Sequence, residues 1–373
     1  MRVAVIGGGV VGLSIAWTLS RDHTVTVLDP QPGRGASFAA AGMLAPAGEA
    51  WYGEDDLLRA GLDSLGRWPE FAADVAAASG VDPWLRREGT LLVGATEDDA
   101  ADVDRVVTLL ETHAVPTRRL ARREARAAEP ALAPGVRRTV EVPGDLSVHN
   151  RRLIDALGAA CATRDVRTVG AAADVDIDAG RAVGVRLRTD RSRVTADLVV
   201  VAAGCGLAGV GGVPGGIRDA VRPVKGQILR LRSSYPLVTR TVRARVDGFP
   251  VYVVPRRDGE IVLGATTEEQ GYDQRVTVDG VHDLLRAGIA VVPGLRECAL
   301  TETLARLRPG TPDNAPLVGP TSTEGLVVAG GHYRGGVLLA PLTAAAVEAY
   351  VDGSVPPAAA SALHPARLEG AVR

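Results

Sequence analysis

Three glycines near the start of the chain have the spacing of a phosphate-binding turn. Gly7, Gly9 and Gly12 follow a short apolar run and open a stretch of apolar residues with helical periodicity. In such a turn the first glycine permits the tight bend, the second lets a pyrophosphate approach the backbone, and the third lets helix and strand pack closely. Asp29 ends the next β-branched run, where a carboxylate accepts hydrogen bonds from ribose hydroxyls. These residues predict a dinucleotide site, which NAD or FAD would fill.

Two further glycine-rich segments bear on the choice between NAD and FAD. Residues 35–44, GASFAAAGML, follow soon after Asp29, and their small side chains would let backbone amides approach a cofactor closely. Residues 330–339, GGHYRGGVLL, place a glycine turn before a predicted helix, whose amino end would stabilise negative charge on a reduced flavin. A simple NAD dehydrogenase has no need of this second turn, so the sequence favours FAD.

No set of side chains indicates acyl transfer or a metal centre. Cys161, Cys205 and Cys298 lie far apart with no CxxC pair, so neither a zinc site nor a disulfide framework is expected. No nucleophile, base and orienting acid occur as a recognisable set. His149, Cys205 and Cys298 are expected to be structural, and His332 is expected to act through its backbone.

The regions around these motifs are predicted to form a β-α-β unit at the amino end, followed by further strands and helices. Residues 2–6 and 24–28 are predicted strands joined by a helix over residues 10–19. Residues 196–206 and 325–329 are apolar enough to be central parallel strands. The other predicted helices are residues 54–78, 98–113, 121–128, 152–164, 281–290 and 338–351. The other predicted strands are residues 84–93, 182–187, 226–231, 250–255 and 260–266, with shorter ones near Val166 and Val175.

The predicted nucleotide-binding elements occur early, midway and late in the chain, so one domain would be assembled from separated pieces. We expect an α/β fold with two domains, which taken together are of α+β type. A mixed-sheet substrate domain is inserted into a Rossmann-type FAD-binding domain. A chain of 373 residues is also long for one core. The expected FAD-binding domain comprises residues 1–86, 146–220 and 303–373. The expected substrate-binding domain comprises residues 87–145 and 221–302.

Six stretches spread over nearly the whole chain resemble one known family. They are VAVIGGGVVG at 3–12, AAAGMLAP at 39–46, VRPVKGQIL at 221–229, VYVVPRRDGEIVLGAT at 251–266, LRPGTPDNAPLVG at 307–319 and AGGHYRGGVLLAP at 329–341. Together they resemble the FAD-dependent glycine oxidase of thiamine biosynthesis, within the D-amino acid oxidase superfamily. The set is specific, although each stretch alone is not, and it implies the fold of D-amino acid oxidase.

The resemblance implies roles for three side chains. Arg308 matches the arginine that binds the substrate carboxylate, for which its planar guanidinium is suited. Tyr252 matches the tyrosine whose hydroxyl contacts the same carboxylate, and Arg334 matches an arginine beside the flavin and the substrate. These three are the expected catalytic residues.

The resemblance also implies which residues hold FAD. Residues 332–338 match the turn around the isoalloxazine ring, and residues 40–42 match its other flank. Val10 and Val11 match backbone positions at the pyrophosphate, and Ala172 matches a position at the adenine end. The full expected set is Gly7, Gly9, Val10, Val11, Gly12, Leu28, Asp29, Ala40, Ala41, Gly42, Met43, Ala172, His332, Tyr333, Arg334, Gly335, Gly336, Val337 and Leu338.

Three positions depart from the family pattern and leave the exact substrate open. Gly335 stands where the family often has asparagine, Arg306 where it often has a small residue, and Thr267 where one well-known type has a methionine lining the pocket. Arg306 would share a strand face with Arg308. Lys225, the only lysine of the chain, either supports the active site or lies on the surface.

The expected activity is the oxidative deamination of a small amino acid. The resemblance implies that glycine, with sarcosine or small D-amino acids as further substrates, loses a hydride to FAD and that O2 takes up the electrons as H2O2. The imine then hydrolyses to glyoxylate and ammonia, or supplies the thiazole ring of thiamine. The alternatives are a D-amino acid oxidase, an amino acid dehydrogenase of the same fold that uses another electron acceptor, and a flavin-binding module without turnover.

Composition limits the expected partners. The formal net charge is -2 and the basic residues are scattered, so nucleic acid is not an expected partner. No stretch approaches the roughly 20 apolar residues of a membrane span. We therefore expect a soluble, cytoplasmic enzyme that binds a small amino acid and O2. Family members commonly associate, so the resemblance implies a homo-oligomer, with a tetramer as the expected form.

Overall fold

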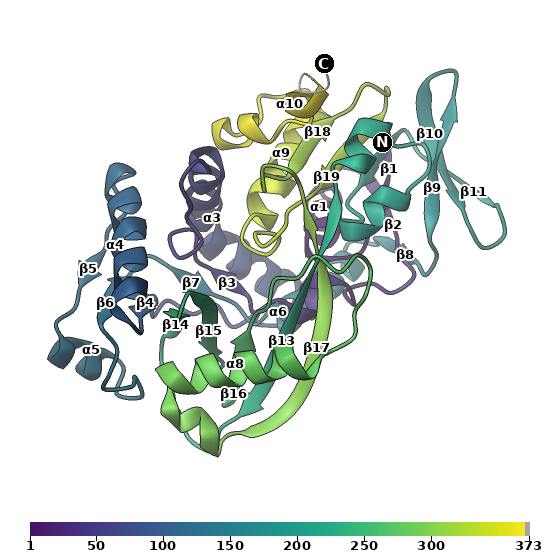
Figure 1. Cartoon of the computed structure of the whole chain (residues 1–373). Coiled ribbons are helices and arrows are strands. Elements are labelled where there is room, and N and C mark those ends of the chain that lie inside the picture. The colour runs from purple at the N-terminus through teal and green to yellow at the C-terminus, as the bar shows by residue number, and fades with distance from the viewer. Residues whose placement is uncertain (370–373) are drawn as a thin grey trace.

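The computed structural model describes the backbone of residues 1–369 and contains two large sheets (Figure 1). The first sheet has the strand order β18-β19-β12-β1-β2-β8, and neighbouring strands are parallel except for β18 and β19. Its strands are β1 (Arg2–Ile6), β2 (Thr24–Leu28), β8 (Arg167–Val169), β12 (Leu198–Val201), β18 (Leu317–Pro320) and β19 (Leu326–Gly330). The turns after β1 and β19 therefore lie at the carboxyl edge of a parallel sheet, where ligands bind in folds of this type.

Alternate residues of the central strand β1 pack into different layers. Val3 and Val5 belong to the core shared with the helices, whereas Ala4 and Ile6 belong to the core on the opposite face. The helices of the first layer are α1 (Val10–Leu19), α3 (Asp55–Ser79), α6 (Asn150–Ala162) and α9 (Ala340–Asp352), which contact one another. A small sheet of β9 (Ala173–Asp178), β10 (Arg181–Leu187) and β11 (Arg193–Thr195) covers the other face. The sheet is thus buried on both sides, as its near-continuous apolar strands require.

The second sheet has the strand order β17-β13-β16-β15-β14-β4-β6-β5 and is mixed, because only β4 and β14 are parallel neighbours. Its strands are β4 (Thr90–Gly94), β5 (Arg118–Arg119), β6 (Arg138–Val142), β13 (Arg222–Arg232), β14 (Thr241–Val246), β15 (Phe249–Pro255), β16 (Glu260–Gly264) and β17 (Ala299–Gly310). The helices α4 (Glu97–Thr112) and α8 (Val278–Val291) pack against its strands, and α5 (Arg122–Ala128) leads into β6. The long pair β13 and β17 extends from this sheet toward the first one (Figure 1).

Several short elements complete the chain. They are α2 (Ala36–Ala39), β3 (Met43–Leu44), β7 (Leu146–Ser147), the 3-10 helix η1 (Gly204–Gly209), α7 (Gly215–Asp219), η2 (Pro293–Glu297), η3 (Ala358–Leu363) and α10 (Ala366–Glu369). The pair β3 and β7 places residues that are far apart in the sequence side by side, next to α2.

Two buried arginines link the second sheet to the segment before β3. Arg256 is 5% exposed, and its guanidinium donates hydrogen bonds to the carbonyls of Val148, at 2.8 Å, and Ala41. Arg230 is 1% exposed, pairs with Glu260 of β16 at 2.5 Å and donates to the carbonyl of Phe38 at 3.4 Å. Charge-assisted hydrogen bonds of this kind hold the backbone of the small-residue segment against the second sheet.

Most of the elements predicted from the sequence are confirmed, and α1, β1 and β2 have the predicted bounds. The strand predicted over residues 84–93 was wrong in its first half, because positive φ angles at Trp84 and Gly89 interrupt the extended chain and only β4 forms. The helix predicted from residue 338 begins at Ala340, after two hydrogen-bonded turns. Strand β14 was not predicted, because its polar alternation, TVRARV, lacks the apolar run that marks a buried strand.

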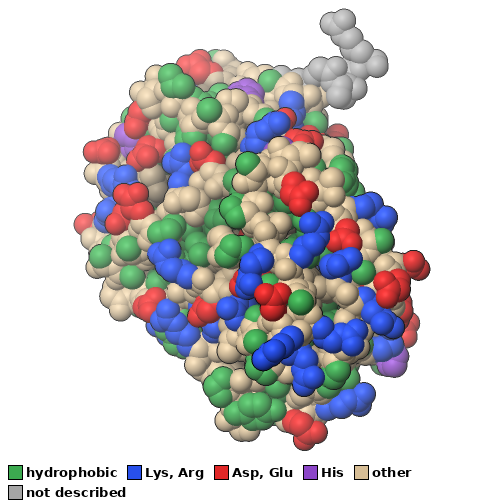
Figure 2. Space-filling view, turned by 90° about the vertical axis from the view of Figure 1, so that its left-hand side faces the viewer, with side chains coloured by type: hydrophobic (Ala, Val, Ile, Leu, Met, Phe, Trp, Pro, Cys, Tyr) green, Lys and Arg blue, Asp and Glu red, His purple; other side chains and the backbone are tan. Residues whose placement is uncertain are grey.

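The division into two domains stays a prediction. The first sheet contains β1, β2, β8, β12, β18 and β19, and the second contains strands from residues 90–142 and 222–310. Strand β17 crosses the expected boundary at residue 303 and remains in the second sheet over its whole length. Among residues 1–369, no helix combines the length and apolar character needed to cross a membrane. Acidic and basic side chains are interspersed on the face shown in Figure 2.

Candidate active site and cofactor site

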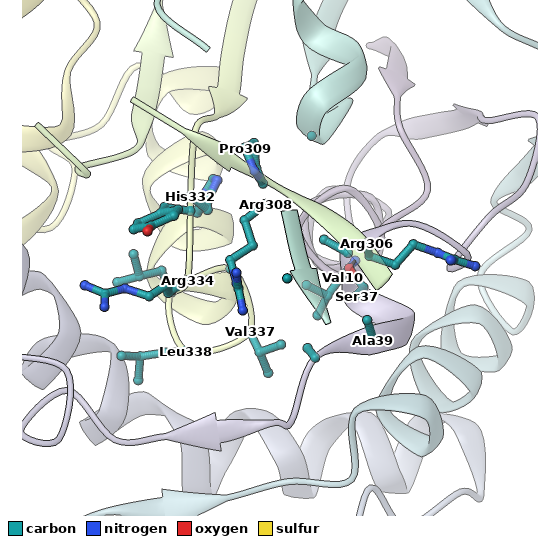
Figure 3. A pocket seen from close by; sticks show the side chains of 18 of the residues that line it. Val10, Ser37, Ala39, Arg306, Arg308, Pro309, His332, Arg334, Val337 and Leu338 are labelled. Carbon is teal, nitrogen blue, oxygen red and sulfur yellow. Dashed lines mark hydrogen bonds between the residues drawn. The ribbon is translucent and has the colours of Figure 1, made fainter. Parts of the chain in front are cut away.

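A cavity of about 490 Å³ is lined by residues from both large sheets. The lining includes Asp29 and the start of α1, with Val10. The lining also includes Arg308 of β17, whose side chain reaches into the open centre between Arg334 and Ser37 (Figure 3). Segments predicted to bind a cofactor and a side chain predicted to bind substrate therefore line one cavity.

The glycine turn after β1 has little room for larger residues. Gly7 has a φ of +114°, which a side chain would strain, and a Cβ on Gly12 would overlap the carbonyl oxygen of Gly7. The Asp29 carboxylate accepts hydrogen bonds from the amides of Gly8 and Gln31, both at 2.7 Å. These bonds fix the carboxylate beside the turn, at the edge of the cavity.

The first turn of α1 offers free hydrogen-bond donors to the cavity. The amide of Val10 donates to Ser37 Oγ at 3.0 Å. Within the described residues, the amides of Gly9, Val11 and Gly12 donate no hydrogen bond. Unpaired amides at a helix amino end form an anion site, which a pyrophosphate would fill.

Small residues form the wall next to this turn. Gly42 has a φ of +70°, and a Cβ there would overlap the carbonyl oxygen of Val148. The amide of Val148 in turn donates to the Gly42 carbonyl at 2.8 Å. Ala40, Ala41 and Met43 line the cavity beside it. The wall is therefore flat and is tied to the neighbouring chain by its backbone.

The turn before α9 is anchored from behind. The carbonyl of Leu338 accepts hydrogen bonds from Ser64 Oγ at 2.6 Å and Trp68 Nε1 at 2.8 Å. His332 Nε2 lies 2.9 Å from Thr343 Oγ1, and burial lowers the pKa of His332 to about 4. The imidazole is therefore neutral at physiological pH and holds the turn in place.

These features fit FAD. Asp29, suited to an adenosine ribose, and the turn of residues 332–338, suited to a flavin ring, line the same cavity. The free amides at the start of α1 suit the pyrophosphate. The amides of residues 336–338 also donate no hydrogen bond within the described part of the chain, so they can face an anionic edge of a flavin.

Arg308 is positioned with its guanidinium largely uncommitted. It lies within β17. Its Nη1 donates to the carbonyls of Thr266, at 3.1 Å, and Lys225, at 3.4 Å, while Nε and Nη2 donate no hydrogen bond to the described residues. Gly226 gives it room, because a Cβ there would stand 2.5 Å from Arg308 Cζ. The free donors can hold a carboxylate in the bidentate manner.

Tyr252 of β15 lines the same cavity. Its ring lies over Gly264, where a Cβ would stand 2.5 Å from the phenol oxygen. Burial raises the pKa of the Tyr252 hydroxyl, and the nearby charge of Arg308 only partly offsets this. The phenol therefore stays protonated and can donate a hydrogen bond to an anion beside Arg308.

A carboxylate, Glu49, lies between two arginines on the cavity wall. Arg243 Nη1 donates to Glu49 Oε1 at 2.8 Å, and Arg334 Nε lies 3.5 Å from Glu49 Oε2. All three residues line the cavity. Burial alone would raise the pKa of Glu49, but the charges of the surrounding arginines outweigh it and hold this pKa below its ordinary value. Glu49 is thus an anion at neutral pH.

A second carboxyl group lies behind this wall. Asp145 is 1% exposed, and burial raises its pKa to about 7, although the nearby charge of Arg243 opposes the shift. It does not line the cavity and forms no ion pair within 4 Å among the described residues. Asp145 is therefore only partly ionised at neutral pH.

Most of the residues predicted to form the site line the cavity. They are Gly9, Val10, Val11, Asp29, Ala40, Ala41, Gly42, Met43, Tyr252, Arg308, His332, Tyr333, Arg334, Gly335, Gly336, Val337 and Leu338. Gly7, Gly12, Leu28 and Ala172 lie off the wall. The Leu28 carbonyl accepts a hydrogen bond from the amide of Gly7 at 2.8 Å, and the Ala172 carbonyl accepts one from the amide of Arg188 at 2.9 Å. The individual roles stay predictions.

The three positions that depart from the family pattern all line the cavity: Thr267, Gly335 and Arg306. Arg306 and Arg308 share β17, but the Arg306 guanidinium donates to the Arg34 carbonyl at 3.0 Å and points away from Arg308 (Figure 3). Arg306 is therefore not a second ligand for the group that Arg308 would bind.

Lys225 is not on the surface. Its side chain is 1% exposed and pairs with Glu268 at 3.1 Å, next to the strand that carries Arg308. His149 caps α6 with its Nδ1, and burial lowers its pKa to about 4. Burial raises the pKa of both Cys205, to about 12, and Cys298, so neither thiol is activated.

Sequence reasoning missed three polar residues of the site. Ser37 and Glu49 occur in or just after the small-residue segment, where a single hydroxyl or acid carries no pattern. Arg243 is the cross-strand partner of Tyr252 in the β14–β15 pair, so its place depends on strand register. Only the register, which the sequence does not show, could have revealed it.

Comparison with known proteins agrees with this geometry. Residues 2–349 match the model of the family described as FAD dependent oxidoreductase. The chain belongs to this family. FAD is accordingly its cofactor, and the α/β fold with a Rossmann-type sheet is that of the family.

Individual relatives cover nearly the whole chain. It is 33% identical over 354 residues to the glycine oxidase of Geobacillus kaustophilus, which covers 94% of this chain and 92% of the relative. The crystal structure of glycine oxidase from Geobacillus kaustophilus superposes with a TM-score of 0.88 at 31% identity, covering 97% of this chain and 98% of that one. The bifunctional protein ThiO/ThiG of Synechocystis is 31% identical over 365 residues, which are 95% of this chain and 52% of that protein.

Proposed function

We propose that this flavoenzyme oxidises glycine to glyoxylate, ammonia and H2O2, with O2 as the electron acceptor, and that sarcosine and small D-amino acids are further substrates. The observation that carries the proposal is that Arg308 and Tyr252, which are close enough for the charge of one to act on the other, line the same cavity as the start of the dinucleotide-binding helix at Val10. The glycine oxidase names of its relatives support the choice of substrate.

The carboxylate of the substrate is held by two groups. Arg308 offers Nε and Nη2, which are free of other acceptors among the described residues, and Tyr252 offers its protonated hydroxyl. A charge-assisted bidentate pair fixes both the position and the orientation of a carboxylate. The α-carbon is thereby held next to the turn of residues 332–338, in a near-attack position.

No described residue is assigned as a general base for the α-hydrogen, because the ionised Glu49 is held by Arg243 and Arg334. His332 is neutral, buried and engaged with Thr343, and Tyr252 stays protonated. The amino group therefore binds in its neutral form, and the α-hydrogen leaves with its electron pair. Bound FAD supplies the two-electron acceptor for this hydride and passes the electrons to O2. The imine that remains adds water and yields glyoxylate and ammonia.

The cellular setting belongs to the proposal as well. The resemblance to the glycine oxidase of thiamine biosynthesis supports a role in which the imine supplies the thiazole ring. We place the enzyme in the cytoplasm, in keeping with its unpaired cysteines, Cys161, Cys205 and Cys298. A homo-oligomer, expected as a tetramer, stays a prediction that the mass of the purified protein would test.

The test is an oxidase assay on the purified holoenzyme. Glycine, sarcosine, D-alanine and D-proline are added separately in air while peroxide and the flavin absorbance are followed. We expect peroxide with glycine, and its loss in Arg308→Ala with the flavin spectrum retained. Flavin that an amine reduces under anaerobic conditions without peroxide in air would show a dehydrogenase. Flavin that no amine reduces would show a binding module without turnover.

A further inference from the structure

The carbonyl groups of the segment before β3 are bonded to a buried polar cluster behind the cavity wall. Asn150 Nδ2 donates to the carbonyls of Ser37, at 2.8 Å, and Phe38, at 2.9 Å. Arg256 donates through Nη2 to the carbonyl of Ala41. Asn150 and Arg256 do not line the cavity, whereas Ala41 does. These carbonyls therefore point away from the space that a cofactor would fill.

The peptide unit between Ala41 and Gly42 turns its amide toward the cavity. This peptide bond is trans, and in a trans peptide the C=O and N–H bonds point in opposite directions. Because the Ala41 carbonyl faces Arg256, the Gly42 amide faces away from that guanidinium, on the side that lines the cavity. This amide donates no hydrogen bond within residues 1–369. It is therefore a free donor for a ligand.

The flavin ring is the part of FAD that this amide would meet. Ser37 lies beside Val10 at the start of α1 (Figure 3), and the Val10 amide donates to its Oγ at 3.0 Å. Further along the segment, Ala41 belongs to the apolar cluster against which Tyr252 packs. The segment thus leads from residues suited to a pyrophosphate to a residue proposed to contact the substrate. The reacting ring of FAD must lie next to the substrate, and so within reach of Gly42.

Arg256 is held in place from several sides. Its Nη1 donates to the carbonyl of Val148 at 2.8 Å, and its Nη2 lies 3.4 Å from Asn150 Oδ1. Burial and the nearby charge of Arg230 lower the pKa of Arg256 to about 9, although the charge of Glu260 opposes the shift, so the guanidinium is a cation at neutral pH. Burial of a cation costs free energy, which hydrogen bonds to neutral carbonyls offset only in part. The stability of the fold therefore does not by itself explain this arginine.

We propose that Arg256 is a positioning residue for the flavin, which holds the carbonyl of Ala41 and thereby fixes the Gly42 amide as a hydrogen-bond donor to the ring. Two-electron reduction adds negative charge to the ring, so a donor that is held in place interacts more strongly with reduced FAD than with oxidised FAD. Arg256 thereby raises the midpoint potential of the bound cofactor. The inference concerns the cofactor alone and does not depend on which amino acid is oxidised.

The test is the two-electron midpoint potential of the holoenzyme, measured against reference dyes under anaerobic conditions. Arg256→Lys keeps the positive charge, but an ammonium does not reproduce the planar geometry that bonds two carbonyls at once. We expect both Arg256→Lys and Arg256→Met to lower the potential by about 30 mV, the tenfold change that one hydrogen bond supports for a two-electron couple. An unchanged potential in both variants would overturn the proposal. A potential that falls only in Arg256→Met would show that the charge acts directly, which would overturn the role of the Gly42 amide.

Arg257→Met is the matched control. Arg257 is the next residue in the sequence, but its guanidinium donates to Asp82 at 3.0 Å and to the carbonyl of Leu85 at 3.1 Å, and not to the segment before β3. Its replacement removes the same charge from the neighbouring position and should leave the midpoint potential unchanged. An equal fall of the potential in Arg257→Met would overturn the assignment to Arg256.

The affinity of the apoprotein for FAD separates positioning from a general loosening of the site. The midpoint potential reports only the difference in affinity between reduced and oxidised FAD, so a variant that binds both forms equally less tightly keeps its potential. Calorimetric titration with oxidised FAD should show that Arg256→Lys changes this affinity by less than about threefold. Arg256→Lys carries both measurements if Arg256→Met does not retain FAD. Loss of FAD binding in Arg256→Lys, or a large loss of affinity with an unchanged potential, would show a purely structural role and overturn the proposal.

Discussion

The replacement of Gly226 by alanine tests whether Arg308 is the carboxylate ligand. An added Cβ would stand 2.5 Å from Arg308 Cζ, whereas ordinary contacts begin near 3.4 Å. The guanidinium must therefore move by about 1 Å, which is of the size that costs about a hundredfold in rate at a catalytic site. The backbone is restrained, because Gly226 is paired with Arg306 of β17 and the preceding Lys225 is bridged to Glu268.

We expect Gly226→Ala to lower kcat/KM for glycine about a hundredfold, or about 2.7 kcal/mol of transition-state stabilisation. The assay is steady-state peroxide release, with flavin content measured by absorbance to show that cofactor is retained. Gly158→Ala is the control, since Gly158 lies in α6 and an added Cβ would contact nothing within 4 Å. That variant should keep full activity.

A double-mutant cycle shows whether the effect passes through Arg308. If the alanine acts by displacing the guanidinium, Gly226→Ala should add little loss in an Arg308→Met background. A similar loss in both backgrounds would mean that the alanine disturbs something else. Full activity of Gly226→Ala alone would mean that the guanidinium position observed here does not govern turnover.

Four further outcomes are expected. Arg308→Met should lower kcat/KM for glycine by about a thousandfold, because the charged partner of the substrate carboxylate is removed, while the flavin spectrum persists. Tyr252→Phe should lower it about tenfold, the value of one hydrogen bond, with the loss seen mainly in KM. Burial raises the pKa of Asp145 from its ordinary 3.8 to about 7, so the folded chain binds more protons than the unfolded chain between these values. Its contribution to stability therefore falls as pH rises from about 4 to 7, by at most about 4 kcal/mol, and Asp145→Asn should flatten the pH dependence of the free energy of unfolding measured in urea. Gly42→Ala should release FAD on gel filtration, because a Cβ there overlaps the Val148 carbonyl.

The nucleotide end of the site could be predicted from the sequence because its signals are local. Gly7, Gly9 and Gly12 lie within one β-α-β unit, and Asp29 ends its second strand, so spacing along the chain determines position in space. The turn of residues 330–339 was recognisable for the same reason. Each of these segments needs only its own strand and helix to be placed correctly.

The substrate end could be predicted only through the resemblance. Arg308 reaches the cavity because Gly226, on a different strand, leaves space for its guanidinium. Tyr252 depends in the same way on Gly264, which pairs with it across β15 and β16. These contacts join residues 12 to 82 positions apart, and no periodicity in a single sequence encodes strand register.

The ion pair of Glu49 and Arg243 could not be predicted from the sequence. The two residues are 194 positions apart, and their ion pair requires the β14–β15 register, the turn after β3 and the small Gly48 to be correct together. Each residue alone reads as an ordinary surface charge. Substrate selectivity depends on the side chains that surround the bound molecule, and not on those that hold the carboxylate common to all amino acid substrates. The residues that decide selectivity are therefore ones that motif spacing along the chain does not reveal.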